Sequence, residues 1–394
     1  MSAPVRPRIA IVAGTPQLLA AAAALGVDAV FVHAGNEPPT DAGHAIAVSN
    51  VDAEAVFSVL APLHTVRPFD RVLSLTEAGL LPAAEVGQRL GVDGNPLHTV
   101  RLLQDKRRMR ELPAANELSP VLARPVSSAA DLAVFCRGAG GPVILKPAAG
   151  TASRAVFLVE AEQHAATVWE EFVLAGGVDP IAEEFLDGQE LSVEAFSHDG
   201  EHVVIALTDK LLGPNFVELG HTVPSALPAA RQEEIKALVL GFLDAVGLRE
   251  GPSHTEVKLT SRGPRVIESH NRIGGDKIRE LVRRAYGHDL VQLTVGCPLG
   301  LTPPPEPVPA RRGAAIRFLT PASGTVARIV LPRDTEGCVI DLAVGTGDVI
   351  GEVRSSGDRS GYVLAEGVDA EDATGRGERV RDAITVETVP AGRD

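Results

Sequence analysis

The stretch HTEVKLTSRGPRVIE, residues 254–268, predicts a β-hairpin that carries an acidic residue in each strand. Two short strand-like runs flank the segment Thr260–Pro264, which contains a glycine and a proline and is typical of a turn. With Ser261-Arg262-Gly263 at the tip, the pairing is symmetric. We therefore expect Glu256 to lie directly opposite Glu268.

Glu256 and Glu268 form a candidate metal site. Opposed side chains of an antiparallel pair have Cβ atoms roughly 4.5–5.5 Å apart, and like charges at that distance destabilise the pair. A proton or a cation is therefore required between the two carboxylates. Mg²⁺ suits carboxylate ligands and commonly brings substrate phosphates with it, so the pair predicts a Mg²⁺ site that could also take Mn²⁺. The spacing alone leaves open a solvated strand face with two ordinary acids.

Alternation along the two strands predicts which side chains share the site. Side chains of a strand point to opposite faces in turn. The face of the acids would carry His254, Glu256, Lys258, Val266, Glu268 and His270. The buried face would carry Thr255, Val257, Leu259 and Ile267.

The hairpin continues into Ile267–Asp276, IESHNRIGGD, which has features of a phosphate-binding loop. Arg272 offers a rigid fork suited to phosphate oxygens. Gly274-Gly275 would let the backbone approach a ligand closely at the start of a helix. A surface loop with a helix cap is the alternative, because glycine-rich turns are common.

Length and composition bound the class of protein. The chain has 394 residues, which predicts two or three domains, and its 45% hydrophobic and 22% charged residues are typical of a globular protein. The net charge of −14 and the 4% aromatic content argue against a nucleic acid or an anionic membrane as main partner. The three scattered cysteines predict a reducing, cytoplasmic location and no zinc motif. We expect neither a signal peptide nor a transmembrane helix.

Changes in pattern along the chain predict its organisation. Residues 1–95 alternate strand-like and helix-like runs, as in a doubly wound α/β domain. A mixed core follows over residues 96–300, beginning with a basic helix, Leu97–Glu111. The proline-rich segment 301–310 is typical of a semi-rigid linker, and short strand-like runs predict a small β-rich domain over 311–394.

Two segments of the core have features of a nucleotide site. Lys146 ends a strand-like run before a loop whose small residues, including Gly150 and Ser153, offer N–H groups and hydroxyls to a phosphate. The loop lacks a Walker pattern, and a solvated lysine is the alternative. The segment Glu183–Glu190, EEFLDGQE, has acids at both ends that could grip a nucleoside, or it is an ordinary acidic turn.

The segment Asp209–Ser225 predicts a long loop with polar residues at its centre. Long loops in compact domains are often functional. Glu218 could pair with an amine and His221 could contact a carboxylate. A surface loop without function is the alternative.

In this order, these segments resemble the ATP-grasp superfamily over most of the chain. The resemblance rests on Lys106, Lys146 with its loop, EEFLDGQE, HTEVKL and IESHNRIGGD. The segment Phe216–Ser225, FVELGHTVPS, resembles the L-amino-acid ligases, the dipeptide-forming group similar to bacilysin synthetase. The resemblance implies an N-terminal α/β domain, an ATP-grasp core and a β-rich C-terminal lid.

The resemblance also implies roles for individual residues. Lys106 and Lys146 would contact ATP phosphates, and Arg272 would stabilise an acyl-phosphate and the tetrahedral state after it. The remaining implied roles are adenine recognition by Glu183 and the backbone of Glu184 and Leu186, ribose binding by Glu190, Mg²⁺ binding by Glu256 and Glu268, and a substrate pocket of Glu218, His221, Gly275 and Asp276.

One position departs from the family pattern. Where many ATP-grasp enzymes read Glu-x-Asn after the second acid, this chain has His270, with Asn271 next to it. Histidine suits Mg²⁺ less well than oxygen donors do, so a role in orienting Glu268 or touching substrate is the alternative for His270.

The implied activity is that of an ADP-forming carboxylate–amine ligase that joins an amino acid to an amine, usually another amino acid, through an acyl-phosphate. The resemblance is compatible with a homodimer. A purine-type ligase or carboxylase and a non-catalytic ATP-binding regulatory protein are the alternatives. The FVELGH segment argues against the first, and both acids together with Lys146 and Arg272 argue against the second.

Overall fold

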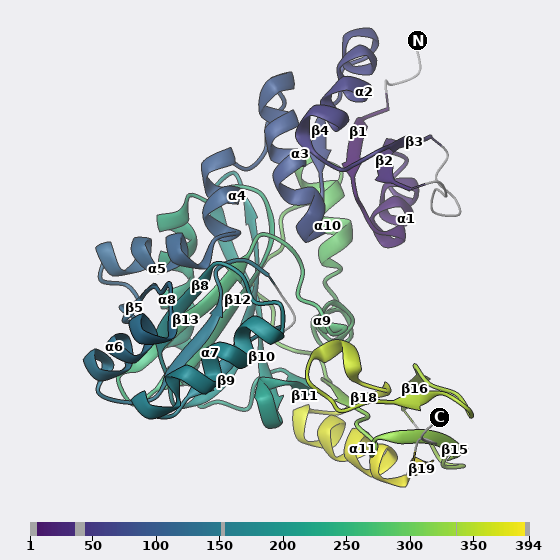
Figure 1. Cartoon of the computed structure of the whole chain (residues 1–394). Coiled ribbons are helices and arrows are strands. Elements are labelled where there is room, and N and C mark those ends of the chain that lie inside the picture. Colours follow the sequence, from purple (N-terminus) through teal and green to yellow (C-terminus); the bar gives the residue numbers. More distant parts are fainter. Residues whose placement is uncertain (1–5, 36–43, 151–153, 336, 391–394) are drawn as a thin grey trace.

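The computed structural model describes residues 6–35, 44–150, 154–335 and 337–390. Figure 1 shows the N-terminal sheet at one end of the molecule, the C-terminal strands at the other, and the largest sheet between them. In the described part of the chain, no helix combines the length and the apolar character needed to cross a bilayer.

The N-terminal sheet is parallel and has helices on both faces. Its strand order is β3-β2-β1-β4. Its elements are β1 (Arg8–Val12), α1 (Pro16–Ala24), β2 (Asp28–Ala34), β3 (Ala45–Val48), α2 (Ala53–Val66), β4 (Arg71–Leu73) and α3 (Glu77–Leu90). Ile9 and Ile11 pack toward α1 and α10 (Leu290–Gly296), while Ala10 and Val12 pack toward α2 and α3. Burial on both faces explains the continuous apolar strands and confirms the predicted doubly wound α/β arrangement.

A second, four-stranded antiparallel sheet carries Lys146 and Glu183. Its order is β5-β8-β6-β7, and two helices pack against it. Its elements are β5 (Ala123–Pro125), α6 (Ala129–Ala139), β6 (Val143–Pro147), β7 (Phe157–Val159), η1 (Glu162–His164), α7 (Ala165–Leu174) and β8 (Pro180–Glu184). In the ladder between β6 and β8, Lys146 pairs with Ile181 and Ile144 pairs with Glu183. Lys146 and Glu183 therefore project from neighbouring strands.

The third sheet has eight antiparallel strands and runs from the core into the C-terminal region. Its order is β13-β12-β9-β10-β11-β14-β18-β16. Its strands are β9 (Gln189–His198), β10 (Glu201–Leu212), β11 (Glu218–Val223), β12 (Gly251–Thr260), β13 (Gly263–His270), β14 (Gly313–Phe318), β16 (Cys338–Leu342) and β18 (Gly361–Gly367). Pairing of β11 with β14 makes the C-terminal strands a continuation of the core sheet.

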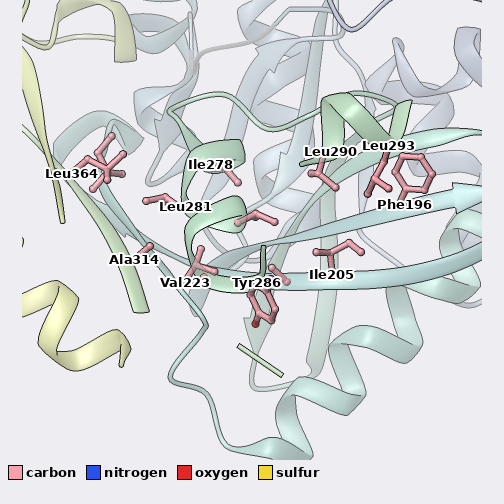
Figure 2. Packing of buried hydrophobic residues seen from close by; sticks show 14 of the residues in the cluster. Phe196, Ile205, Val223, Ile278, Leu281, Tyr286, Leu290, Leu293, Ala314 and Leu364 are labelled. Carbon is pink, nitrogen blue, oxygen red and sulfur yellow. The ribbon is translucent and has the colours of Figure 1, made fainter. Parts of the chain in front are cut away.

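Helices cover both faces of this sheet. On one face lie α4 (Leu97–Leu103), α5 (Lys106–Ala115) and α8 (Ala229–Val246), and the buried residues of α8 recur at helical spacing from Ile235 to Val246. On the other face lie α9 (Ile278–Tyr286) and α10. Figure 2 shows Leu281 of α9 and Leu290 of α10 in one buried cluster with Ile205 of β10 and Val223 of β11. Helix α9 therefore fixes the loop that precedes it against the sheet.

The remaining elements complete the C-terminal region. They are η3 (Cys297–Leu299), β15 (Gly324–Val330), β17 (Val349–Ile350), η4 (Ser356–Asp358), α11 (Ala370–Ala383) and β19 (Thr385–Val389), with β17-β15-β19 as a small separate sheet. The turn η4 begins with a capping box between Ser355 and Asp358, which holds its backbone in place.

Glu256 does lie opposite Glu268, but by a different route from the one predicted. Thr260 pairs with Gly263, so the tip is a two-residue turn and not the three residues Ser261-Arg262-Gly263. A bulge between Glu256 and Val257 on one strand, opposite the segment Val266–Glu268 on the other, adds the missing residue and restores the register.

The bulge exchanges the predicted faces of two residues. Val266 is fully buried opposite Val257 in the core, whereas Ile267 lines the cavity beside Glu268. The backbone groups at the bulge find side-chain partners, because Arg110 donates to the carbonyls of Val266 and Ile267 and Ser119 accepts from the Val266 N–H. Partners from a distant helix and loop are not visible in a pattern of alternation, which is why the prediction for these two residues was wrong.

Two further expectations differ from the structure. The predicted helix Leu97–Glu111 is divided into α4 and α5 at Gln104–Asp105. The predicted loop Asp209–Ser225 is mostly a hairpin, in which β10 and β11 flank η2 (Pro214–Phe216). Lys210, Glu218 and His221 are strand residues that line an internal cavity, and this environment masks the alternation expected of a half-buried strand.

Candidate active site

Glu256 and Glu268 are each held by the ammonium group of a lysine. Lys210 Nζ lies 2.8 Å from Glu256 Oε1, and Lys106 Nζ lies 3.0 Å from Glu268 Oε2. Burial by itself raises the pKa of both carboxyl groups, but Lys210 and Lys106 override this effect and hold both pKa values well below the usual range. The two like charges therefore sit together because positive groups stand beside them, and a divalent cation between the two acids would have to displace these ammonium groups.

Lys210 contacts three carboxylates at once. Its Nζ lies 2.8 Å from Glu190 Oε1 and from Glu256 Oε1, and 3.5 Å from Glu218 Oε1, and its side chain is 3% exposed. Burial alone lowers the pKa of Lys210, but the surrounding acids raise it well above its usual value. Three acids therefore share this ammonium group, and Lys258 and His254 supply further positive charge beside Glu190 and Glu256.

A buried histidine supports Glu256. His254 Nδ1 lies 3.0 Å from both oxygens of Glu194, a fully buried acid of β9, and His254 Nε2 lies 3.4 Å from Glu256 Oε1. Burial alone lowers the pKa of His254, but Glu194 raises it to about 9. The imidazolium can therefore donate to both acids at neutral pH and fix the position of the Glu256 carboxylate.

Lys146 and Glu183 form a buried ion pair together with Arg110. Arg110 donates to both Glu183 oxygens at 2.9 and 2.8 Å, and Lys146 Nζ lies 2.8 Å from Glu183 Oε2. Burial is the largest influence on the pKa values of both Lys146 and Glu183. It lowers the pKa of Lys146. By itself it raises the pKa of Glu183, but Arg110 and Lys146 outweigh it and bring that pKa down to about 2. The predicted adenine contact of Glu183 would have to share an oxygen with these donors.

The other residues predicted for the nucleotide lie along the same cavity. The side chain of Glu184 turns to the Leu122 N–H and to Arg262, which suits a contact through its backbone alone. Leu186 is buried, and Glu190 pairs with Lys210 and with Lys258 Nζ at 3.1 Å. The predicted contact of Ser153 lies outside the described residues.

The predicted substrate residues meet a turn of the C-terminal region. Asp276 accepts from both terminal nitrogens of Arg359, at 2.7 and 2.5 Å, and its Oδ2 lies 3.1 Å from His221 Nε2. Burial alone raises the pKa of Asp276, but Arg359 and His221 override it and hold the pKa well below the usual range. Glu218 Oε2 accepts from the Ser356 hydroxyl at 2.5 Å. The sequence pattern gave no indication that this turn reaches the site.

Glu77, at the start of α3, connects the N-terminal sheet to the site. Its Oε1 lies 2.9 Å from His270 Nδ1 and 2.5 Å from Arg272 Nε. His270 Nε2 in turn lies 3.3 Å from Glu268 Oε1. Because both ring nitrogens of His270 face carboxylates, the geometry favours the orienting role over a metal ligand. Asn271 lines neither of the two cavities described next.

Two cavities adjoin at the acid pair. The first is lined by Lys106, Lys146, Glu183, Glu184, Leu186 and Glu190. The second, of about 430 Å³, is lined by Glu218, His221, His270, Arg272, Gly275 and Asp276. Lys210, Glu256 and Glu268 line both. A phosphate at the end of a nucleotide in the first cavity would therefore meet a molecule held in the second.

Sequence reasoning missed Arg110, Lys210, Glu77, Arg359 and Ser356. Arg110 lies within the predicted basic helix and Lys210 lies within the predicted loop, but neither was singled out there. Their charge alone does not distinguish them from solvated neighbours. Glu77, Ser356 and Arg359 come from regions without any motif, and only long-range packing brings them to the site.

Three family models match this chain. They are described as an ATP-grasp N-terminal domain over residues 19–94, an ATP-grasp domain over residues 139–280, and an L-amino acid ligase C-terminal domain 2 over residues 317–389. The order of the three agrees with the order of the sheets.

Individual relatives point the same way. Carnosine synthase 1 of Gallus gallus is 30% identical over 300 residues, which are 70% of this chain and 32% of that protein. Alanine–anticapsin ligase of Bacillus subtilis is 27% identical over 248 residues, 57% of this chain and 52% of that protein. The chain thus spans about a third to a half of these relatives. The solved L-amino acid ligase of Bacillus licheniformis has the same fold, with a TM-score of 0.80 at 23% identity over 98% of this chain and all of that one.

Proposed function

We propose that this chain is an ADP-forming carboxylate–amine ligase. The proposal proceeds from the chain's membership of the ATP-grasp superfamily and its similarity to the L-amino acid ligases of that superfamily. Its products would be an amide or peptide, ADP and phosphate. The proposed substrates are an amino acid and an amine, most simply a second amino acid. Purine-type ligation and non-catalytic ATP binding receive no specific support from the site.

One observation carries the proposal, namely that Glu256, Glu268 and Lys210 line both cavities. A ligase of this kind must bring the γ-phosphate of ATP to a substrate carboxylate. The junction of the two cavities offers the negative charge for a metal and the positive charge for a phosphate at one place. The family relationship supports ATP as the occupant of the first cavity.

The acid pair fits a Mg²⁺ ion. The two carboxylates face each other across β12 and β13, and their charge is offset by lysine ammonium groups that a cation can displace. Oxygen donors are the ligands that Mg²⁺ requires, and Mn²⁺ accepts the same set. A bound ion would neutralise the phosphate oxygens during transfer.

The side chains around the junction would do four tasks. Lys106 and Lys146 would hold phosphate oxygens, and His254 and His270 would keep the two acids in place. Arg272 would stabilise charge on the acyl-phosphate and on the tetrahedral state, since a guanidinium donates to two oxygens at once. Glu218 would receive the ammonium group of the amino acid.

The proposed reaction has two steps that balance without a nucleophilic side chain. The substrate carboxylate oxygen attacks the γ-phosphorus of ATP, the bond to the β-phosphate oxygen breaks, and ADP leaves. The neutral amine then attacks the acyl carbon, the bond to the phosphate oxygen breaks, and phosphate and a proton are released. The chain's contribution is positioning and charge neutralisation.

Two measurements test this function. The first is phosphate release from ATP in the presence of Mg²⁺ and pools of amino acids, and the second is the mass of the product. We expect release only when amino acids are present, and a mass equal to their condensation product. ATP binding without amino-acid-dependent release would overturn the ligase and favour a binding protein. Release that depends on a purine precursor would favour the other enzyme class.

A further inference from the structure

Five acids line the second cavity. Glu256 and Glu268 form the proposed metal site and Glu77 contacts His270 and Arg272, which leaves Glu218 and Asp276 as candidates for the ammonium group of a substrate. Asp276 is bound by both terminal nitrogens of Arg359 and lies beside His221. Glu218 receives one hydrogen bond from the neutral Ser356 hydroxyl and lies 3.5 Å from Lys210, whose ammonium group is closer to two other acids. Glu218 is therefore the acid with negative charge left for a ligand.

Arg359 is built into this position. Its guanidinium carbon lies 3.6 Å from the centre of the Phe318 ring, its Nε donates to the Ser356 carbonyl, and its side chain is 9% exposed. Asp276 and Ser356 line the cavity, whereas Arg359 is not among the lining residues and stands behind Asp276. The guanidinium thus cancels the Asp276 charge without occupying space that a substrate would use.

We propose that Arg359 and Ser356 are specificity-determining residues of the substrate pocket. Arg359 masks the charge of Asp276, and Ser356 fixes Glu218 for the ammonium group of the substrate. The pocket therefore selects amino acids with uncharged side chains. This inference rests on the proposed function. A second ammonium group, as in a basic side chain, would face the masked Asp276 and the guanidinium of Arg272. Glu77, the remaining acid of this cavity outside the acid pair, already contacts His270 and Arg272.

Direct binding tests the inference without turnover. The probes are L-norvaline and L-ornithine, whose side chains have similar length and differ by a terminal ammonium group. Each is titrated calorimetrically into protein loaded with Mg²⁺ and a non-hydrolysable ATP analogue. We expect the wild type to prefer norvaline. In Arg359→Ala, the exposed Asp276 charge should shift the ratio of the two dissociation constants toward ornithine by about tenfold or more.

A reversal by a second substitution distinguishes masking from a structural effect. Asp276→Asn combined with Arg359→Ala removes the unmasked acid and should restore the wild-type ratio. Asp276→Asn alone leaves Arg359 without its carboxylate partner and should weaken ornithine binding further. This variant tests the inference even if Arg359→Ala does not fold. Arg354→Ala is the matched control, because Arg354 is 77% exposed in the same turn region and pairs with Glu352.

Two outcomes distinguish failure of this inference from failure of the proposed function. The inference alone would be overturned if Arg359→Ala bound both amino acids with an unchanged ratio of dissociation constants. It would also be overturned if Arg359→Ala weakened both probes equally and the double variant did not reverse this. Binding of neither probe by wild-type protein, together with no amino-acid-dependent phosphate release, would overturn the proposed function and the inference with it.

Discussion

The ammonium group of Lys210 lies 2.8 Å from the carboxylate of Glu256, at the wall shared by the two cavities. Lys210 is therefore a fixed positive charge at the place where a metal ion would bind to Glu256. Replacing it changes the demand for an external cation.

Lys210→Met should destabilise the metal-free protein and increase its response to Mg²⁺. The change leaves three acids without their shared partner. Removing one member of a buried ion pair typically lowers the free energy of unfolding by about 3–5 kcal/mol. In thermal unfolding, saturating Mg²⁺ should raise the midpoint more in the variant than in the wild type. Lys236→Met, at a partly exposed lysine of α8 that pairs with the exposed Glu233, is the control. Equal Mg²⁺ responses in all three proteins would contradict this account.

Glu268→Gln should abolish turnover and leave the fold intact. The amide keeps the shape of the side chain but removes one of the two charges that would bind Mg²⁺, so we expect the rate to fall about 100-fold or more. Phosphate release measures activity, and Mn²⁺ binding by paramagnetic resonance measures the metal site. Glu352→Gln, at a side chain that is 65% exposed, controls for the chemical change. Activity like that of the wild type would rule out the metal assignment.

Glu183→Gln should lower stability in a way that depends on pH. The pKa of Glu183 is about 2, below the ordinary value of 4.5, because Arg110 and Lys146 outweigh its burial. A depressed carboxyl pKa contributes stability that is fully present above pH 4.5 and is lost as the pH falls toward 2. The free energy of unfolding in urea should therefore differ by about 3 kcal/mol between wild type and variant at pH 7.

The same difference should shrink steadily below pH 4.5. Glu233→Gln, which removes an exposed acid paired with Lys236, should show little difference at any pH. A gap between wild type and Glu183→Gln that stays constant from pH 7 to pH 3 would show that the ion pair does not carry the effect.

Glu77→Gln should lower the rate of the chemical step through Arg272. Glu77 lies 2.5 Å from Arg272 Nε and 2.9 Å from His270 Nδ1, so it orients both groups from the N-terminal sheet. We expect kcat to fall about tenfold, as for other partners that orient a site, while KM for ATP changes little. The same substitution in an Arg272→Lys background should have a much smaller effect, since residues that act as a unit are not additive. Additive losses would point to a purely structural contact.

The sequence determined the types of groups that the site contains. The alternation of HTEVKL placed Glu256 with Lys258 and His254, and the apolar runs of residues 1–95 predicted helices on both faces of a sheet, because local periodicity reflects which side of an element is buried. These features depend on neighbours within one element. The domain boundaries and the homodimer stay predictions.

Only the tertiary structure decided how these groups are paired and what charge they leave free. The bulge at Val266–Ile267 depends on Arg110 and Ser119, and the state of Asp276 depends on Arg359, 83 residues further along the chain. Such partners arrive through sheet pairing and helix packing, and no spacing rule connects them. For this protein, residue type in sequence indicated a phosphate and carboxylate chemistry, while the long-range ion pairs determine which acids are available to a ligand.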